Sequence, residues 1–320
     1  MTGSGPAAVQ HHSTAFLAHA TQLRLALIIL NTDERLKGEA SNDLFSHLWE
    51  QATVRVCADG AANRLHDALS TERRAVLSSQ RIAPAERCSN LLPDVITGDL
   101  DSIRPEVMEF YERLGVPLVR VDEQDSHDFE KCLRWLQVQQ EATGSKQPYS
   151  VVAYGAFGGR LDQQMANLNM LFRRDFQCFE RFVLLDHHSL ALLLAPGAHA
   201  IEPCLDVEDG KCGLIPMGGA CEAVTTQGLK WNLEGEGLAF GSLVSSSNQI
   251  AAPTARPARP KVANARTPGR LVPSVLACIG RARRLGCSRC RAAAWRLQVT
   301  VQTDKPLLWT TSIRKQGPPP

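Results

Sequence analysis

The pattern that decides the fold lies in residues 150–172, SVVAYGAFGGRLDQQMANLNMLF. Residues 150–154 form a short apolar run that predicts a buried strand. A glycine-rich turn follows, and apolar side chains then recur at the spacing of one helical face, at Leu161, Met165, Leu168 and Phe172. A strand that leads through a tight turn into a helix is one unit of a parallel α/β sheet.

Further units of the same kind lie on both sides of this stretch. A helical pattern begins near Asp128, with Phe129, Cys132, Leu133 and Leu136 on one face. Further short runs predict strands at residues 25–30, 54–58, 95–97, 118–121 and 182–185. Strands that alternate with helices predict an α/β domain over residues 21–186, with a mostly parallel, Rossmann-like sheet and flanking helices.

The sequence pattern changes after this domain. From residue 187 onward, short β-rich runs are separated by turn signals, among them a run at 229–233 that includes Trp231. This pattern predicts a C-terminal all-β sandwich domain over residues 187–250 and 297–315. Residues 1–20 show no periodicity and are expected to form a loose N-terminal tail.

Charge is divided unevenly along the chain. Residues 251–296 contain ten Arg, one Lys and no acidic residue, which gives +11, whereas the rest of the chain carries −9. We expect this basic Ala/Arg/Pro-rich insert, which holds five Pro, to be disordered. Because the basic residues are concentrated there, nucleic-acid binding is not expected of the acidic main body.

Several classes of protein are excluded. The longest apolar runs fall well short of the ~20 residues of a membrane-spanning helix. The first twenty residues have no Lys or Arg and no apolar core of a secretory signal. The ten cysteines include a single CxxC pair, at 287 and 290, and lack the spacing of a four-ligand zinc site. We therefore expect a cytoplasmic protein without a membrane partner.

Two aspartates follow the predicted strand at 95–97. In an extended stretch, residues i and i+2 such as Asp99 and Asp101 point to the same side. Two carboxylates on one side repel each other unless a cation lies between them, and Mg²⁺ prefers such hard oxygen ligands. Asp128, at a helix start, would supply a third ligand. The alternative is an ordinary turn in which the aspartates cap backbone N–H groups.

The turn at 155–159 is suited to phosphate. Gly155 and Gly158 allow backbone N–H groups to approach anionic oxygens, and the start of the following helix favours negative charge. Arg160 comes next and can pair with phosphate through two nitrogens, while Lys131 offers a point charge. The turn has neither Walker nor GxGxxG spacing, so the alternative is a turn that only connects the strand to the helix.

The β-rich part offers weaker signals. A core or edge aromatic is the plain interpretation of Trp231, whereas a cationic heteroaromatic substrate would make use of its ring face. Residues 245–248 form a short polar run, SSSN, that fits either a loop or a set of hydrogen-bond donors to a ligand.

Several stretches together resemble the eukaryotic thiamine pyrophosphokinases. They are CADGAANR (57–64), TGDLDSIRPE (97–106), DEQDSHDFEKCL (122–133), GAFGGRLDQQMANLN (155–169), CGLIP (212–216), TTQGLKWNL (225–233), AFGSLVSSSN (239–248) and TDKPLLWT (303–310). That family combines an α/β domain with a β-sandwich domain. Its members use Mg²⁺ and transfer pyrophosphate from ATP to the thiamine hydroxyl, giving thiamine diphosphate and AMP. They are homodimers with active sites at the subunit interface.

The resemblance implies roles for individual residues. Asp99, Asp101 and Asp128 would hold the metal and form the catalytic set with Arg160. Substrate binding would involve two groups, the nucleotide or phosphate residues Asp59, Asn63, Arg64, Lys131, Gly155, Gly158 and Asp162, and the thiamine residues Gln124, Trp231, Ser245 and Asn248. Thiamine and ATP are the expected substrates, Mg²⁺ the expected cofactor, and a second copy of the chain the expected partner.

The chain departs from the family pattern in three places. Ala61 stands where the family has a second glycine, His127 replaces a threonine, and the insert at 251–296 has no counterpart. Because the insert adjoins the expected thiamine pocket, two other functions stay open beside the transferase. One is a catalytically impaired thiamine- or nucleotide-binding protein, and the other is an interaction protein that acts through the basic insert.

Overall fold

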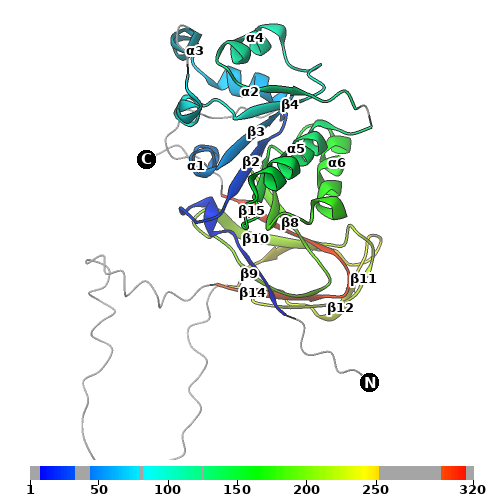
Figure 1. The fold of residues 1–320 in the computed structure, drawn as a ribbon. Coiled ribbons are helices and arrows are strands. Elements are labelled where there is room, and N and C mark those ends of the chain that lie inside the picture. Colours follow the sequence, from blue (N-terminus) through cyan, green and yellow to red (C-terminus); the bar gives the residue numbers. More distant parts are fainter. Residues whose placement is uncertain (1–7, 33–43, 79–81, 124, 252–296, 315–320) are drawn as a thin grey trace, which may run out of the picture.

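The computed structural model describes residues 8–32, 44–78, 82–123, 125–251 and 297–314. Within these residues the strands form two sheets. The larger has ten strands in the order β13-β10-β15-β8-β7-β6-β2-β3-β4-β5, and the smaller has five in the order β1-β9-β14-β11-β12. Figure 1 shows the α/β half at the top and the β-rich half below it.

Six neighbouring strands of the larger sheet pair in parallel, from β7 to β5. Every residue of the central strands β2, β6 and β3 is buried, as expected for a sheet covered on both faces. The six are β2 (Leu25–Ile29), β3 (Val54–Ala58), β4 (Val95–Gly98), β5 (Leu118–Arg120), β6 (Ser150–Tyr154) and β7 (Arg181–Leu185). They confirm the parallel sheet predicted from the sequence.

Helices cover both faces of this sheet. Leu27 of β2 belongs to an apolar core that includes residues of α1 (Leu44–Gln51), α2 (Ala61–Ala68) and α4 (Pro105–Arg113). Ile28, the next residue, belongs to a second core with α5 and α6. The remaining elements of this half are α3 (Thr71–Ser78), α5 (Asp128–Thr143), α6 (Leu161–Phe172), η2 (Pro84–Glu86), η3 (Cys88–Asn90) and η4 (Arg174–Phe176).

The β-rich half is a sandwich that shares the larger sheet. β7 pairs antiparallel with β8, so the sheet continues from one half into the other. Trp309, which is fully buried, packs in the same core as Ile201 and Val301 of the smaller sheet. The strands are β8 (Ser189–Leu194), β9 (Gly197–Glu202), β10 (Glu208–Ile215), β11 (Cys221–Gln227), β12 (Glu234–Leu238), β13 (Ser245–Gln249), β14 (Val299–Thr303) and β15 (Leu307–Ile313).

Two local expectations were wrong. Residues 10–13 of the expected loose tail form β1 (Gln10–Ser13), which pairs in parallel with β9, and Phe16 of the following η1 (Ala15–Leu17) is buried. A short polar strand that pairs through its backbone leaves no apolar periodicity to recognise. The expected strand at 229–233 is a bend, because the Asn232 side chain bonds both backbone groups of Leu229.

Some expectations concern residues beyond this description. All of the basic insert except Ala251 lies outside the described residues. Among the helices that are described, none is long and apolar enough to cross a membrane.

Candidate active site

Three carboxylates converge where β3 and β4 end. Asp59 directly follows β3, Asp99 directly follows β4, and Asp128 is the first residue of α5. One carboxylate oxygen of each lies within 4.8 Å of those of the other two. The carboxyl ends of neighbouring parallel strands are the usual position of ligand sites in open α/β sheets.

The predicted metal set was Asp99, Asp101 and Asp128, and the structure gathers a different set. Leu100 has a left-handed backbone with φ 61°, so the segment is a turn and not an extended strand. Asp101 is therefore exposed, and its backbone N–H donates to Oδ1 of Asp99 over 3.4 Å. Asp59 occupies the third position in the cluster.

Gly98 makes room for the cluster. A Cβ at this position would lie 2.6 Å from Cβ of Asp59 and 2.9 Å from Oδ1 of Asp128. Both distances are shorter than carbon–carbon or carbon–oxygen contacts allow, so any other residue would push the carboxylates apart.

Two side chains hold the turn that carries Asp99. The Asp59 carboxylate accepts the backbone N–H groups of Ser102 and Ile103, each over 3.0 Å. Asn63 donates to the carbonyl of Ser102 over 2.9 Å and accepts the N–H of Arg104 over 3.0 Å. Asn63, expected to bind nucleotide, thus positions the loop at residues 99–104.

Lys131 balances part of the negative charge. Its buried Nζ lies 3.1 Å from Oδ2 of Asp99 and 3.3 Å from Oδ1 of Asp128. Burial lowers the pKa of Lys131, but the bond to Asp99 and the charge of Asp128 outweigh burial and raise this pKa above its usual value. One ammonium group faces three carboxylates, so the cluster has room for additional positive charge.

The three carboxyl groups differ in acidity. Burial raises the pKa of Asp59 to about 6, against the opposing effect of its two backbone hydrogen bonds. Burial and the charge of Asp99 raise the pKa of Asp128. For Asp99, burial raises the pKa, yet the bond from Lys131 and other hydrogen bonds outweigh burial and lower it. Asp99 is therefore the strongest acid of the three.

A cavity of about 400 Å³ joins two of the three carboxylates to the glycine turn; its lining includes Asp99, Asp128, Gly155, Gly158 and Arg160. Gly155 and Gly158 both have a left-handed backbone, with φ 83° and 87°. The N–H groups of Gly155 and Ala156 already donate to the carbonyl of Leu185, over 2.8 Å and 3.2 Å. Arg160 is exposed and pairs with Asp162, with Nε 3.0 Å from Oδ1.

The donor set fits a hard divalent cation. Carboxylate oxygens are the ligands that Mg²⁺ prefers, usually one or two of them together with substrate phosphates. Buried polar atoms beside the cluster are also unsatisfied: within the described residues, Ser126 Oγ and His127 Nε2 have no hydrogen-bond partner. Both residues line the cavity, which is consistent with a polar ligand there.

The expected thiamine residues form a second group in the β-rich half. Buried Asn248 accepts the N–H of Trp231 over 3.3 Å and donates to its carbonyl over 2.7 Å. The same amide donates to Oγ of Ser245 over 3.4 Å. Trp231 is 55% exposed, so it is not a core residue, and it lies in a bend and not in a strand. Gln124 lies outside the described residues.

Sequence reasoning missed several polar residues of the cavity. Asn31 follows β2 and accepts a bond from Nε of Arg64 over 3.3 Å. Asn167 of α6 donates to the carbonyl of Ala156 over 2.9 Å and holds the glycine turn. The rule that ligands bind beyond the carboxyl ends of strands applies to Asn31 as it does to Asp59.

Two family models match the parts of the chain that contain these two groups of residues. A family model described as the catalytic domain of thiamin pyrophosphokinase matches residues 45–183, and one described as its vitamin B1 binding domain matches residues 198–256. The chain belongs to the thiamin pyrophosphokinase family. The carboxylate cluster and Lys131 fall in the first match, and Trp231, Ser245 and Asn248 fall in the second.

Other thiamin pyrophosphokinases match in sequence and in structure. Thiamine pyrophosphokinase 1 of Oryza sativa subsp. japonica is 38% identical over 214 residues, covering 65% of this chain and 76% of the relative. Thiamine pyrophosphokinase 1 of Arabidopsis thaliana is 32% identical over 318 residues, covering 97% and 95%. The crystal structure of yeast thiamin pyrophosphokinase superposes with a TM-score of 0.68 at 20% identity, covering 95% of this chain and 91% of that one, which shows a shared fold.

Proposed function

We propose that the cluster of Asp59, Asp99 and Asp128 is the catalytic centre of an ATP:thiamine diphosphotransferase. The enzyme transfers the pyrophosphoryl group of ATP to the thiamine hydroxyl, and the products are thiamine diphosphate and AMP. Family membership supports the reaction. The observation that carries the assignment of the centre is the convergence of the three carboxylates, paired with Lys131, beside a cavity that Asp99 and Asp128 share with the glycine turn.

The cofactor in this proposal is Mg²⁺, held by Asp59, Asp99 and Asp128. When bound, it neutralises oxygens of the ATP phosphate chain and the charge that develops on AMP. Asp101 is retained as a candidate ligand, because it lies on the same turn as Asp99 and its side chain is exposed. The hard oxygen donors and the excess of negative charge support this assignment.

The chain's own cations complete the charge balance. Lys131 keeps Asp99 ionised and stays beside the phosphate chain as a fixed positive charge. Arg160 exchanges its partner Asp162 for phosphate oxygens, which its planar guanidinium binds through two nitrogens. Positioning and charge neutralisation account for most of the catalysis in phosphoryl transfer, so no covalent intermediate is needed.

Thiamine binds, in this proposal, near Trp231 and Asn248, with the cationic heteroaromatic ring on the exposed indole face. Asn248 lies on β13, eight strand positions from β4 in the larger sheet. At ~4.8 Å per strand this is about 38 Å across the sheet, far more than one thiamine molecule can span. This separation within one chain supports a site that two copies of the chain complete together.

We accordingly propose a homodimer with active sites between the subunits. Both regions expose large apolar side chains of the kind that interfaces cover. Leu161 and Met165 of α6 are 68% and 41% exposed just beyond the glycine turn, although the sequence placed them on a helical face with buried Leu168. In the β-rich half, Trp231 and Phe240 are 55% and 67% exposed. We retain a cytoplasmic location on the sequence grounds given above.

Subunit complementation tests this arrangement. Co-expressed Asp99→Asn and Trp231→Ala chains would form mixed dimers in which one site carries both changes and the other is intact. At thiamine concentrations well below the wild-type KM, where Trp231→Ala sites are about tenfold slower, random mixing then restores about a quarter of wild-type AMP formation. As a matched control, Asp99→Asn with Asp128→Asn leaves every site defective and restores nothing. Activity of the first mixture no higher than the sum of its parts would refute the interfacial site.

A further inference from the structure

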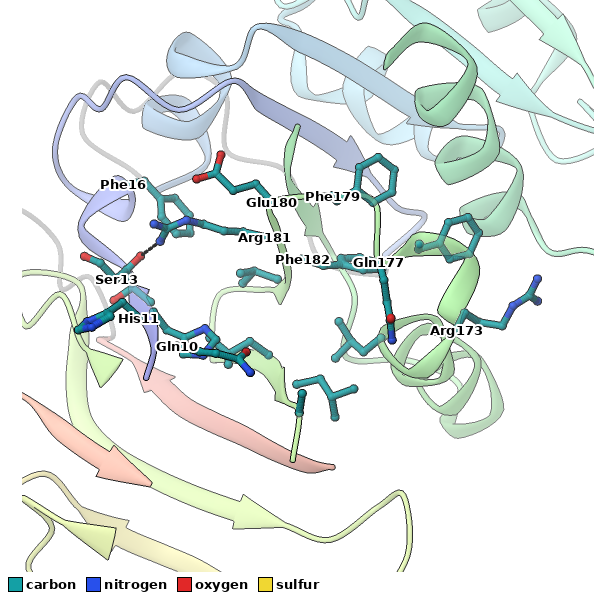
Figure 2. Close-up of a pocket in the computed structure, with 18 residues that line it drawn as sticks. Gln10, His11, Ser13, Phe16, Arg173, Gln177, Phe179, Glu180, Arg181 and Phe182 are labelled. Carbon is teal, nitrogen blue, oxygen red and sulfur yellow. Dashed lines mark hydrogen bonds between the residues drawn. The ribbon is translucent and has the colours of Figure 1, made fainter. Parts of the chain in front are cut away.

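The N-terminal segment is anchored by contacts remote from the active site. β1 pairs in parallel with β9, and Nη1 of Arg181 donates to the carbonyl of Ser13 over 2.7 Å. Figure 2 shows this bond beside a cavity of about 470 Å³, one wall of which is formed by β1. Phe16 is 3% exposed, so the segment is packed as far as η1, and His19 follows at the surface.

The loop opposite this segment, residues 203–207 between β9 and β10, is held by a buried network. Oγ1 of Thr14 accepts the backbone N–H of Cys204 over 2.8 Å. The same hydroxyl donates to the Glu208 carboxylate, which also accepts the N–H of Cys204 over 2.6 Å. Thr14 and Glu208 are 1% and 0% exposed. The backbone of Cys204 is thus fixed relative to the segment that carries His19.

Three potential ligands meet at this junction. A ring nitrogen of His19, the sulfur of Cys204 and a carboxylate oxygen of Asp206 all lie within 4.8 Å of one another. Nε2 of His19 is 3.3 Å from Oδ2 of Asp206. Ligand bonds of ~2.0–2.3 Å at tetrahedral angles separate donor atoms by about 3.3–3.8 Å, and the distance between His19 and Asp206 falls in this range.

We propose that His19, Cys204 and Asp206 bind a divalent transition-metal ion of the zinc type. Nitrogen, sulfur and carboxylate donors are the ligands that Zn²⁺ selects, whereas the all-carboxylate cluster of the active site suits Mg²⁺. Three protein ligands leave one coordination position for water. The ion joins the N-terminal segment to the β9–β10 loop and so stabilises the pairing of β1 with β9.

The surroundings of the sulfur are consistent with this role. Burial and the charges of Asp206 and Glu208 raise the pKa of the Cys204 thiol, and hydrogen bonds from the backbone of Asp206 and Val207 only partly oppose them, so a metal ion must displace the thiol proton. Such outer hydrogen bonds are typical of ligands in metal sites. The competing interpretation is a plain ion pair between His19 and Asp206, since both side chains are exposed. In that interpretation the nearby sulfur of Cys204 has no role.

Metal titration of the full-length protein tests the proposal. The chelator-treated protein is titrated with Zn²⁺ by calorimetry in excess Mg²⁺, which saturates the carboxylate cluster. Cys204→Ser and His19→Ala should each lose one Zn²⁺ equivalent or bind it at least about tenfold more weakly. With Co²⁺ as the probe, a sulfur-to-metal charge-transfer band should appear in the wild type and be missing from Cys204→Ser.

Matched controls separate this site from other thiols and imidazoles of the chain. Cys178→Ser changes an exposed thiol, and His11→Ala changes an exposed histidine of β1. Both variants should bind as many equivalents of Zn²⁺ as the wild type. His19 is itself exposed, so His19→Ala should fold even if Cys204→Ser does not. Unchanged Zn²⁺ stoichiometry and affinity in His19→Ala, or equal losses in the controls, would overturn the proposal.

Discussion

Nζ of Lys131 lies 3.1 Å from Oδ2 of Asp99, and the lysine side chain is almost completely buried. A buried ammonium group is costly unless it is paired, so this contact shows that the cluster is organised around charge balance. The same ammonium group also reaches Asp128, over 3.3 Å. The charge balance of the site therefore depends on this one ammonium group and on any cation that binds beside it.

Replacing Lys131 by Met should make the protein depend on a divalent cation for stability. Without the ammonium group the three carboxylates repel one another, so Mg²⁺ should raise the unfolding temperature of Lys131→Met more than that of the wild type. AMP formation should fall on the order of 10²-fold, as for loss of one preorganised electrostatic group. Thermal unfolding with and without Mg²⁺ checks this. Lys211→Met, which removes an exposed lysine, serves as the control, and equal Mg²⁺ effects in all three proteins would contradict it.

Gly98→Ala should disrupt the cluster by steric overlap. The added Cβ would lie 2.6 Å from Cβ of Asp59, so the carboxylate must move or the strand end must shift. We expect about 1–3 kcal/mol of lost stability together with weaker Mg²⁺ binding, measured by urea unfolding and calorimetry. Gly237→Ala is the matched control, because its Cβ would meet nothing closer than 3.5 Å. Wild-type Mg²⁺ affinity in Gly98→Ala would argue against the cluster as the metal site.

Trp231→Ala should weaken the binding of thiamine and leave the binding of ATP unchanged. The ring is exposed and its backbone is held by Asn248, so its removal should leave the fold intact. Loss of a cation–π contact worth ~1–2 kcal/mol should raise the KM for thiamine about tenfold, with the KM for ATP unchanged. Steady-state kinetics check this, with Val138→Ala, another exposed apolar residue, as the control. A change in the KM for ATP alone would exclude the proposed role.

The stability of β1 should depend on pH through His12. Nε2 of His12 lies 3.0 Å from Nδ1 of His199, and burial followed by the charge of His199 lowers the pKa of His12 to about 4. Because the unfolded pKa is ~6.5, the unfolded state binds the proton first. The stabilising contribution is complete above pH ~6.5 and is lost as the pH falls towards 4.

Relative to His12→Gln, the wild type should therefore lose on the order of 2 kcal/mol of unfolding free energy between about pH 7.5 and pH 4.5. Urea unfolding of both proteins at the two pH values gives this difference. His11→Gln, on the exposed side of the same strand, should follow the wild type. If the difference in unfolding free energy between the wild type and His12→Gln does not change with pH, the lowered pKa of His12 is contradicted.

Much of the site was predictable from strand ends. Asp99, Asp128, Gly155 and Arg160 follow predicted strands or begin predicted helices, and the topology of a parallel sheet brings such positions together. The position of Asp101 was not predictable, because the left-handed conformation of Leu100 is a tertiary outcome that residue spacing does not encode. Asp59 was expected to bind nucleotide or phosphate, and its place in the cluster was not predicted, because the sequence does not show how closely the ends of two strands approach.

Contacts between remote segments account for the other differences. β1 is polar and short, and it is ordered by backbone pairing with β9, about 190 residues further along the chain. His19, Cys204 and Asp206 likewise have no common local motif. Trp231 was placed in a strand because its alternating neighbours suggested one, whereas the hydrogen bonds of Asn232 and Asn248 hold that segment as a bend.

The central claim is that the carboxylate cluster is where pyrophosphate transfer takes place. The most direct measurement is the rate of AMP formation from ATP and Mg²⁺, with and without thiamine, in the wild type, Asp99→Asn and Asp128→Asn. Glu112→Gln, on the exposed face of α4, controls for loss of negative charge. We predict thiamine-dependent AMP formation that falls at least about 10²-fold in both aspartate variants, with unfolding temperatures within a few degrees of the wild type. Near-wild-type rates in both folded variants would contradict the account.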